Sequence, residues 1–256
     1  MSEITHKKLS EEEAKQKEYY NSIAEDYDKH YSEKYSLKYR YDLFDYILKG
    51  IDLKGANVLD AMCGNGQNTQ YFLNKGANVT GLDISEGQCS LFAKRYPKTK
   101  IVCASILDTG FANNTFDFII SDSLHHLHPR VNEAINEIHR ILKPGGKYMI
   151  WEPAAGSIMD YFRKLWYKTD NKYFEENEQS IDINKIKQDF SNKFDFLKIK
   201  YGGNIGYLLV HESIAFRIPI NLIKYYAPVL LPIDRFIQKF QFKLISCWGI
   251  TVVRKK

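Results

Sequence analysis

Cysteine is scarce in this sequence, and its four occurrences are scattered. No two of them form a C-x-x-C pair, and their spacing argues against both a disulfide framework and a zinc site. We therefore expect free thiols in a reducing, cytoplasmic environment. The positions are Cys63, Cys89, Cys103 and Cys247.

Long apolar runs are also missing. No stretch approaches the roughly 18 uninterrupted apolar residues that a membrane-spanning helix needs. The first residues, MSEITHKKLSEEEAKQ, are charged and have no apolar centre, unlike a signal peptide. No internal repeat or low-complexity linker divides the chain. Residues 1–256 are therefore expected to form one domain with a substantial core, in contact with a membrane at most peripherally.

Positive charge is present but unevenly placed. The net charge is +5; residues 203–256 supply the basic excess, while the first fifty residues lean acidic. Within the segment 211–246, an amphipathic helix is predicted at 233–244, IDRFIQKFQFKL. Such a helix covers the sheet or the substrate cleft, or lies on an anionic membrane. Both interpretations stay open, whereas nucleic-acid binding has less support because no recognised module accompanies the basic residues.

From residue 57 short apolar strands alternate with helices. This spacing predicts a parallel sheet covered on both faces, with right-handed crossovers. Ligands in such sheets bind at the carboxyl ends of the strands, where the strand order reverses. The predicted strands are NVLDAM, NVTGLDI, KIVCAS, FDFIIS and KYMIWEP, and their carboxyl ends fall at residues 61–69, 83–86, 104–108 and 121–128.

Other segments flank this core of residues 51–155. Residues 10–50 are predicted to be helical throughout, as an N-terminal cap that begins with the capping box Ser10–Glu13. Tyrosines recur there every four residues, which makes a stripe that either packs on the core or closes over a ligand. Residues 156–246 are interpreted as substrate-side insertions, with a helix at 156–168, a polar loop at 170–193 and further helices at 211–246. Residues 247–256 form the last strand. The stripe consists of Tyr27, Tyr31, Tyr35 and Tyr39.

The stretch VLDAMCGNGQNT, residues 58–69, joins a strand to a glycine-bearing loop. Glycines let backbone amides approach a ligand closely, and the following helix adds its positive N-terminal end. Asp83, at the end of the second strand, is placed to accept hydrogen bonds from ribose hydroxyls. Thr69 breaks the dinucleotide pattern G-x-G-x-x-G, and Asp60 would repel a pyrophosphate. The loop therefore favours a cofactor with a cationic amino group.

Five segments in this order resemble the class I S-adenosylmethionine-dependent methyltransferases, over about residues 17–153. They are YYNSIAEDYDKHY, VLDAMCGNG, GLDIS, FDFIISDSLHHL and EAINEIHRILKPGG followed by KYMIWEP. The resemblance implies an α/β, Rossmann-like, doubly wound and mostly parallel seven-stranded sheet with helices on both faces. It also implies an antiparallel last strand, and N- and C-terminal helices that form a lid. The cofactor would be S-adenosyl-L-methionine, with S-adenosyl-L-homocysteine as product.

The same resemblance assigns cofactor-binding residues. Asp60 and the loop after it would hold the methionine part, Asp83 the ribose, and Ile84 the adenine. Ser121 would lie near the sulfonium, and two tyrosines would close over it. The full predicted set is Tyr20, Tyr27, Asp60, Met62, Cys63, Gly64, Gly66, Asp83, Ile84, Ser105, Ile106 and Ser121.

Two positions depart from the family pattern. Met62 stands where the loop commonly has its first glycine, which crowds the loop. Ser105 stands where a carboxylate usually binds the adenine amine, and Asp108 is near enough to substitute for it. Nothing resembles the N-P-P-Y motif of enzymes that methylate amino groups of nucleic acids, so a small-molecule acceptor is favoured.

The sequence LHHLH follows the fourth strand. Because histidine is the natural proton acceptor at neutral pH, His125 or His126 is predicted to be a general base for an O, N or C acceptor. No metal site is predicted, since three close histidines need a carboxylate or helical spacing to converge. The acceptor is expected to be small, amphipathic or lipid-linked. The alternatives are a nicotinamide-dependent oxidoreductase and a non-catalytic cofactor-binding protein with a peripheral membrane helix.

Overall fold

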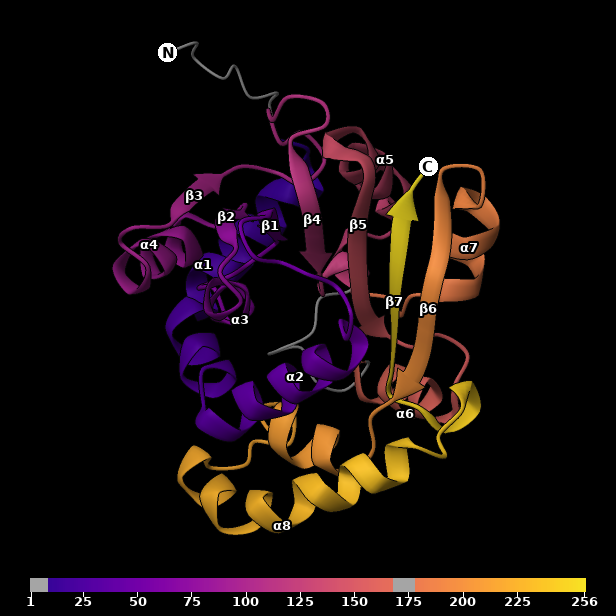
Figure 1. Ribbon diagram of the computed structural model, residues 1–256. Coiled ribbons are helices and arrows are strands. Elements are labelled where there is room, and N and C mark those ends of the chain that lie inside the picture. Colours follow the sequence, from indigo (N-terminus) through magenta and orange to yellow (C-terminus); the bar gives the residue numbers. More distant parts are fainter. Residues whose placement is uncertain (1–8, 168–177) are drawn as a thin grey trace.

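A seven-stranded sheet runs through the protein in the order β3-β2-β1-β4-β5-β7-β6 (Figure 1). The computed structural model describes residues 9–167 and 178–256, without the side chains of Asp26, Tyr27 and Tyr167. The last strand runs antiparallel to both of its neighbours, whereas the others run parallel. The predicted fold class is confirmed. The strands are β1 (Asn57–Ala61), β2 (Asn78–Asp83), β3 (Lys100–Cys103), β4 (Phe116–Ser121), β5 (Leu142–Pro153), β6 (Phe194–Gly202) and β7 (Trp248–Lys255).

The central strands are apolar on both faces, as expected where helices cover both sides of a parallel sheet. Val58 and Leu59 are successive residues of β1 that point to opposite faces, and neither is accessible to solvent. One face packs against the helices α2 (Lys34–Ile47) and α3 (Thr69–Asn74). The other packs against α5 (Val131–Ile141) and α7 (Ile183–Phe190). The two cores cover both faces of the sheet, and the carboxyl ends of its parallel strands lie along one edge.

The N-terminal cap consists of two helices instead of the continuous one predicted. α1 (Glu11–Tyr31) begins at the predicted capping box, and α2 follows after a break at Ser32 and Glu33. The Glu33 side chain caps α2 by accepting hydrogen bonds from the amides of Tyr35 and Ser36. The break divides the tyrosine stripe between two helix axes, and a four-residue spacing in sequence cannot foresee this.

The C-terminal half adds helices around one end of the sheet (Figure 1). α6 (Ile158–Tyr167) and α8 (Ile220–Gln238) occupy the predicted helical regions, with a short π-helix η2 (Tyr207–His211) before α8. α7 lies in the segment predicted to be a loop, because its apolar residues cover the edge of the sheet; residues 170–177 of that segment lie outside the described residues. The remaining elements are α4 (Glu86–Arg95) and the 3₁₀ turns η1 (Leu124–Leu127) and η3 (Lys243–Ile245).

In the described parts of the chain, no helix is both long enough and apolar enough to span a bilayer.

Candidate functional site

A cavity of about 780 Å³ opens at the carboxyl ends of β1, β2, β4 and β5. Its volume lies within the range of roughly 300–1,000 Å³ that is usual for small-molecule sites. One half is walled by α1, the loop after β1 and the end of β2. The other half is walled by η1, the end of β5, α6 and η2. The cavity thus has one part next to the glycine-bearing loop and another next to the C-terminal helices.

Asp83 ties the glycine-bearing loop to the end of β2. Its carboxylate accepts a 2.8 Å hydrogen bond from the Gly64 amide and a 2.9 Å bond from the Ser85 amide. Burial raises the pKa of Asp83 above its ordinary value, while these hydrogen bonds lower it. The residue also lines the cavity. A carboxylate is therefore held with its remaining acceptor capacity at the cavity wall, as binding of hydroxyl groups requires.

Asp60 lies behind the loop. It is fully buried and accepts hydrogen bonds from the Thr69 hydroxyl at 2.7 Å and the Asn68 amide group at 3.2 Å. Burial raises its pKa to about 7. Asp60 is not part of the described cavity wall. Its carboxylate closes the loop onto the following helix, so the predicted direct contact with the cofactor's amino group gains no support from its position.

The predicted site residues divide into two sets. Cys63 and Ser121 are buried away from the cavity, with the Ser121 hydroxyl 2.6 Å from the Tyr148 hydroxyl. Gly66 also lies outside the described cavity wall, and the Tyr27 side chain is outside the described residues. The predicted residues that do line the cavity are Tyr20, Met62, Gly64, Asp83, Ile84, Ser105, Ile106, His125 and His126.

Met62 occupies the left-handed backbone region, with a φ of 59°. This explains why a glycine is common there, since the conformation costs an L-residue about 1–2 kcal/mol. We expect the free energy of unfolding of Met62→Gly to be about 1 kcal/mol higher than that of Met62→Ala, because glycine releases this strain and alanine does not. Chemical denaturation measures the difference. Cofactor affinity should change by less than about tenfold in Met62→Gly; a larger loss would give the thioether a binding role.

Gly66 is fixed by its neighbours rather than by the cavity. Its φ is 93°, and a Cβ there would lie 2.5 Å from Cε2 of Tyr96 and 3.0 Å from Cδ2 of Phe92. Gly66→Ala should therefore lower the free energy of unfolding by about 2–4 kcal/mol, from strain plus overlap. Gly145→Ala is a matched control, with a φ of 74° and no atom within 4 Å of the added Cβ. Equal losses in both variants would show that packing against Tyr96 does not matter.

A buried carboxylate holds His125. The Nδ1 atom of His125 lies 2.7 Å from Oε2 of Glu152. The same oxygen accepts a hydrogen bond from the His125 amide, and Oε1 accepts one from the Leu124 amide. Burial lowers the pKa of His125 well below its ordinary value and raises that of Glu152 to about 8. Sequence reasoning missed Glu152, although its place at the end of β5, in the motif WEP, marks it as a cavity residue.

His126 is engaged differently. Its Nδ1 lies 3.1 Å from Glu178 and its Nε2 lies 2.9 Å from the Tyr20 hydroxyl of α1. The prediction of no metal site assumed that no carboxylate joins the histidines. The structure brings one, because ligand atoms of His125, His126 and Glu178 all lie within 4.8 Å of one another. Each of these groups already has a hydrogen-bond or ion-pair partner, so we assign them no metal.

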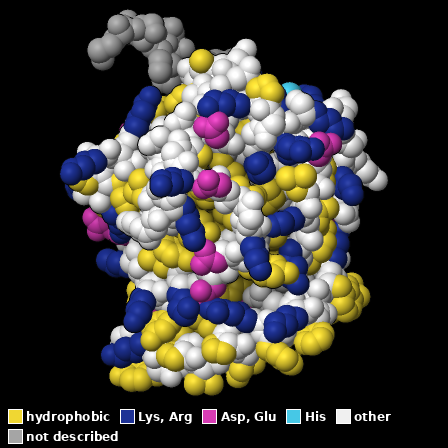
Figure 2. Space-filling view, viewed as in Figure 1, with side chains coloured by type: hydrophobic (Ala, Val, Ile, Leu, Met, Phe, Trp, Pro, Cys, Tyr) yellow, Lys and Arg dark blue, Asp and Glu magenta, His cyan; other side chains and the backbone are white. Residues whose placement is uncertain are grey.

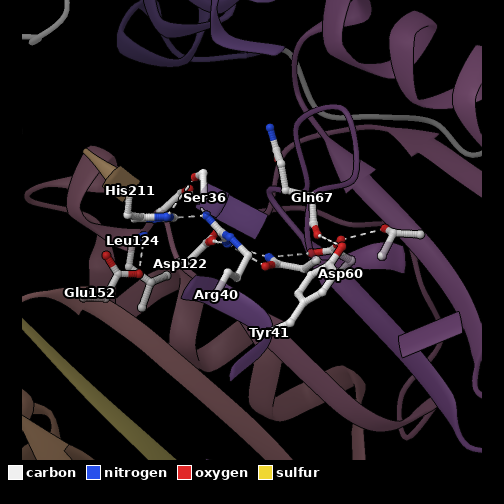
Figure 3. Close-up of polar contacts among 12 residues, drawn as sticks. Ser36, Arg40, Tyr41, Asp60, Gln67, Asp122, Leu124, Glu152 and His211 are labelled. Atoms are coloured by element: carbon white, nitrogen blue, oxygen red, sulfur yellow. Dashed lines mark hydrogen bonds and ion pairs between the residues drawn. The ribbon is translucent and has the colours of Figure 1, made fainter. Parts of the chain in front are cut away.

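Arg40 is a second site residue that sequence reasoning missed (Figure 3). It is buried on α2, donates a 2.6 Å hydrogen bond to Asn68, and forms an ion pair with Asp122 at the end of β4. Its guanidinium also lies 4.9 Å from the Trp151 ring centroid. A buried cation is stable only when paired in this way. The available signal was an arginine on the same helical face as the apolar residues Leu43, Phe44 and Ile47.

Ser105 stands where the family usually has a carboxylate for the adenine amine, but another carboxylate lies close to it. Glu13, from the first turn of α1, accepts a hydrogen bond from the Ser105 hydroxyl and lines the cavity. Asp108, the predicted substitute, is not part of this cavity wall; it lines a smaller cavity beside Arg130. The capping box at Ser10 therefore does more than begin a helix, because it also fixes an acidic side chain at the site.

Polar atoms in the cavity wall fit a bound cofactor. Among the described residues, Nε2 of Gln67, Oε1 of Gln88 and Nε of Arg40 are buried and have no hydrogen-bond partner. All three residues line the cavity. Since buried polar groups are nearly always paired in folded proteins, these atoms are suited to hydrogen-bond a polar ligand in the cavity. They surround the glycine-bearing loop, where an amino-acid moiety would lie.

Comparisons with known proteins agree with this geometry. Residues 59–150 match the family model for a methyltransferase domain. A malonyl-[acyl-carrier protein] O-methyltransferase of Enterobacter lignolyticus is 31% identical over 117 residues, 46% of this chain and 46% of that protein. A sterol 24-C-methyltransferase of Gibberella zeae is 31% identical over 183 residues, 66% of this chain and 44% of that protein. The chain spans about half or less of the length of the first curated relatives that it matches.

A solved structure extends the similarity to nearly the whole fold. The 1,6-didemethyltoxoflavin-N1-methyltransferase of Burkholderia thailandensis, with bound 1,6-didemethyltoxoflavin and S-adenosylhomocysteine, superposes with a TM-score of 0.59. It is 17% identical and covers 98% of this chain and 93% of its own. The family match over residues 59–150 and the shared fold make this chain similar to the class I S-adenosylmethionine-dependent methyltransferases. This similarity favours S-adenosylmethionine over a nicotinamide as the cofactor.

Proposed function

We propose that this protein transfers a methyl group from S-adenosylmethionine to an oxygen, nitrogen or carbon atom of a small amphipathic acceptor. The observation that carries the proposal is the joining of two features in one cavity. The loop tied by Asp83 forms one side, and the His125–Glu152 pair lies on the other. When bound, S-adenosylmethionine supplies a methyl group on a positively charged sulfur.

The residues of the chain then have separate tasks. Asp83 accepts hydrogen bonds from the ribose hydroxyls, Glu13 faces the adenine side, and Gln67, Gln88 and Arg40 contact the amino-acid part. Asp122 and Asn68 hold the Arg40 guanidinium, so that its Nε stays directed at the site. His125 removes a proton from the acceptor. The buried cavity would hold the cofactor and the acceptor next to each other, so little further entropy is lost when they react.

The acceptor half of the cavity supports an apolar or amphipathic substrate. Phe162, Leu165 and Trp166 of α6 line it, together with Phe216 after η2. Relatives with matching segments include a fatty-acid O-methyltransferase of Mycolicibacterium smegmatis and the sterol 24-C-methyltransferase noted above. We extend the proposal to a lipid or lipid-linked acceptor, and to a peripheral contact of residues 211–246 with membranes.

Two measurements test the proposal. Isothermal titration should show one saturable site for S-adenosylmethionine and for S-adenosylhomocysteine. Transfer of a radiolabelled methyl group should then be measured with long-chain fatty acids, sterols and polar amines as acceptors. Label should move into an apolar acceptor in preference to the amines. Tight binding of NADH without binding of S-adenosylmethionine would overturn the proposal.

A further inference from the structure

The helix α8 has two apolar faces, and in the described part of the chain only one of them packs on the core. Ile223, Ala227 and Leu231 are buried against the core. On another side of the helix, Tyr225, Val229 and Phe236 are exposed by 72%, 66% and 61%. The exposed positions recur at intervals of three and four residues, so they form one continuous stripe. This outer face consists of Leu222, Tyr225, Val229, Ile233, Phe236 and Phe240.

Basic residues follow one flank of the outer face. Lys224 and Arg235 are eleven residues apart, and Lys239 follows after four more, which places all three on one side of the helix. All are exposed. Figure 2 shows hydrophobic side chains crowded along the lower edge, where Figure 1 places α8, with lysine and arginine side chains directly above them. Apolar residues beside a cationic flank match the interface of an anionic bilayer.

The outer face continues to the mouth of the cavity. After α8, Phe242, Leu244 and Ile245 are also exposed, and η3 packs against α6. Three side chains of α6 that line the cavity are exposed as well; they are Phe162, Leu165 and Trp166, and Phe162 is accessible by 56%. Trp166 packs on Phe216 with ring centroids 5.0 Å apart. The apolar surface and the acceptor half of the cavity therefore lie at one end of the molecule.

We infer that the outer face of α8 docks on an anionic lipid bilayer and turns the cavity mouth toward it. An amphipathic acceptor then passes from the bilayer along α6 into the cavity without crossing water. The second step rests on the proposed methyl transfer to an amphipathic acceptor, whereas the docking develops the proposed membrane contact of residues 211–246 and does not depend on that reaction. A second copy of this chain would cover the apolar stripe equally well, but it would place the basic flanks of the two copies near each other. The charge pattern therefore favours lipid.

Vesicle binding of the full-length protein tests the inference. Co-sedimentation with phosphatidylcholine vesicles containing phosphatidylglycerol should exceed that with phosphatidylcholine alone, and it should fall as salt is raised. The double substitution Phe236→Ser and Phe240→Ser should lower the partition coefficient about tenfold or more. Tyr46→Ser, which removes an aromatic ring exposed by 62% on α2, should leave it unchanged.

Other outcomes are equally decisive. Equal sedimentation of the double variant and the parent protein would overturn the assigned face. A stable dimer in light scattering that the same double variant dissociates would assign the face to self-association. S-adenosylmethionine titration of the variants separates the two proposals. Loss of vesicle binding with intact cofactor binding supports docking alone, and vesicle binding without cofactor binding contradicts only the methyltransferase proposal.

Discussion

Asp83→Asn should lower the affinity for S-adenosylmethionine about 100-fold or more. The native carboxylate accepts hydrogen bonds from the Gly64 and Ser85 amides, and each such bond to a charged group is worth about 1.5–3 kcal/mol. The amide keeps the shape of the side chain but turns one acceptor into a donor that faces an N–H group. The loop then loses its anchor and the ribose loses its acceptor. Isothermal titration measures the change.

A pH series sharpens this prediction. Since burial raises the pKa of Asp83, the affinity of the native protein should fall as the pH is lowered through that pKa and the carboxylate takes up a proton. Asp83→Asn should lack this dependence. Asp117→Asn is the matched control, because Asp117 also accepts a backbone hydrogen bond, from Asn57, but at the far end of the strands. Native affinity in a folded Asp83→Asn protein would contradict the role given to Asp83.

His125→Ala should lower kcat about 100- to 10,000-fold, the range usual for loss of a positioned general base. KM should change little, since the side chain acts on a proton rather than on binding. His128→Ala is the control, because His128 follows η1 but does not line the cavity. Release of S-adenosylhomocysteine with the best acceptor is the measurement. Equal losses in both variants would remove His125 from the mechanism.

Glu152 should give this reaction its pH dependence. With a pKa near 8, protonated Glu152 donates to Nδ1 of His125, and the imidazole then presents an N–H group to the cavity. Ionised Glu152 accepts from Nδ1 instead, which frees the Nε2 lone pair as a base. The rate should therefore rise with pH through about 8. Glu152→Gln should lose this rise while it keeps the fold, and an unchanged profile would show that Glu152 is only structural.

Much of the fold could be predicted from local patterns. The strands around Val58 and Val79 are short apolar runs bounded by glycine or asparagine, and this pattern identifies a buried parallel strand without knowledge of its partners. Once the strands are identified, their carboxyl ends are known, and Asp83 and His125 are predicted to lie at those ends. The capping box at Ser10 marked the start of α1 for the same reason, since both of its hydrogen bonds form within four residues.

The parts that failed depend on distant contacts. No proline or glycine marks the break between α1 and α2. Packing separates the two helices, and Glu33 then caps the start of α2. α7 was missed because its few apolar residues lie in a polar segment, and only the folded structure shows that they pack against the sheet.

The sequence by itself determined the order of strands and helices, the glycine-bearing loop and the carboxylate that closes it, because these depend on backbone conformation and on neighbours close in the chain. Only the tertiary structure decided which side chains share the cavity. Glu13, Arg40 and Glu152 come from segments far apart in sequence, and their neighbours in the folded chain set their charges: Ser105 and Ser10 lower the pKa of Glu13, Asp122 raises that of Arg40, and burial raises that of Glu152. The tertiary structure also decided which apolar face of α8 is exposed, because the spacing of apolar residues does not show which of two faces the core will cover.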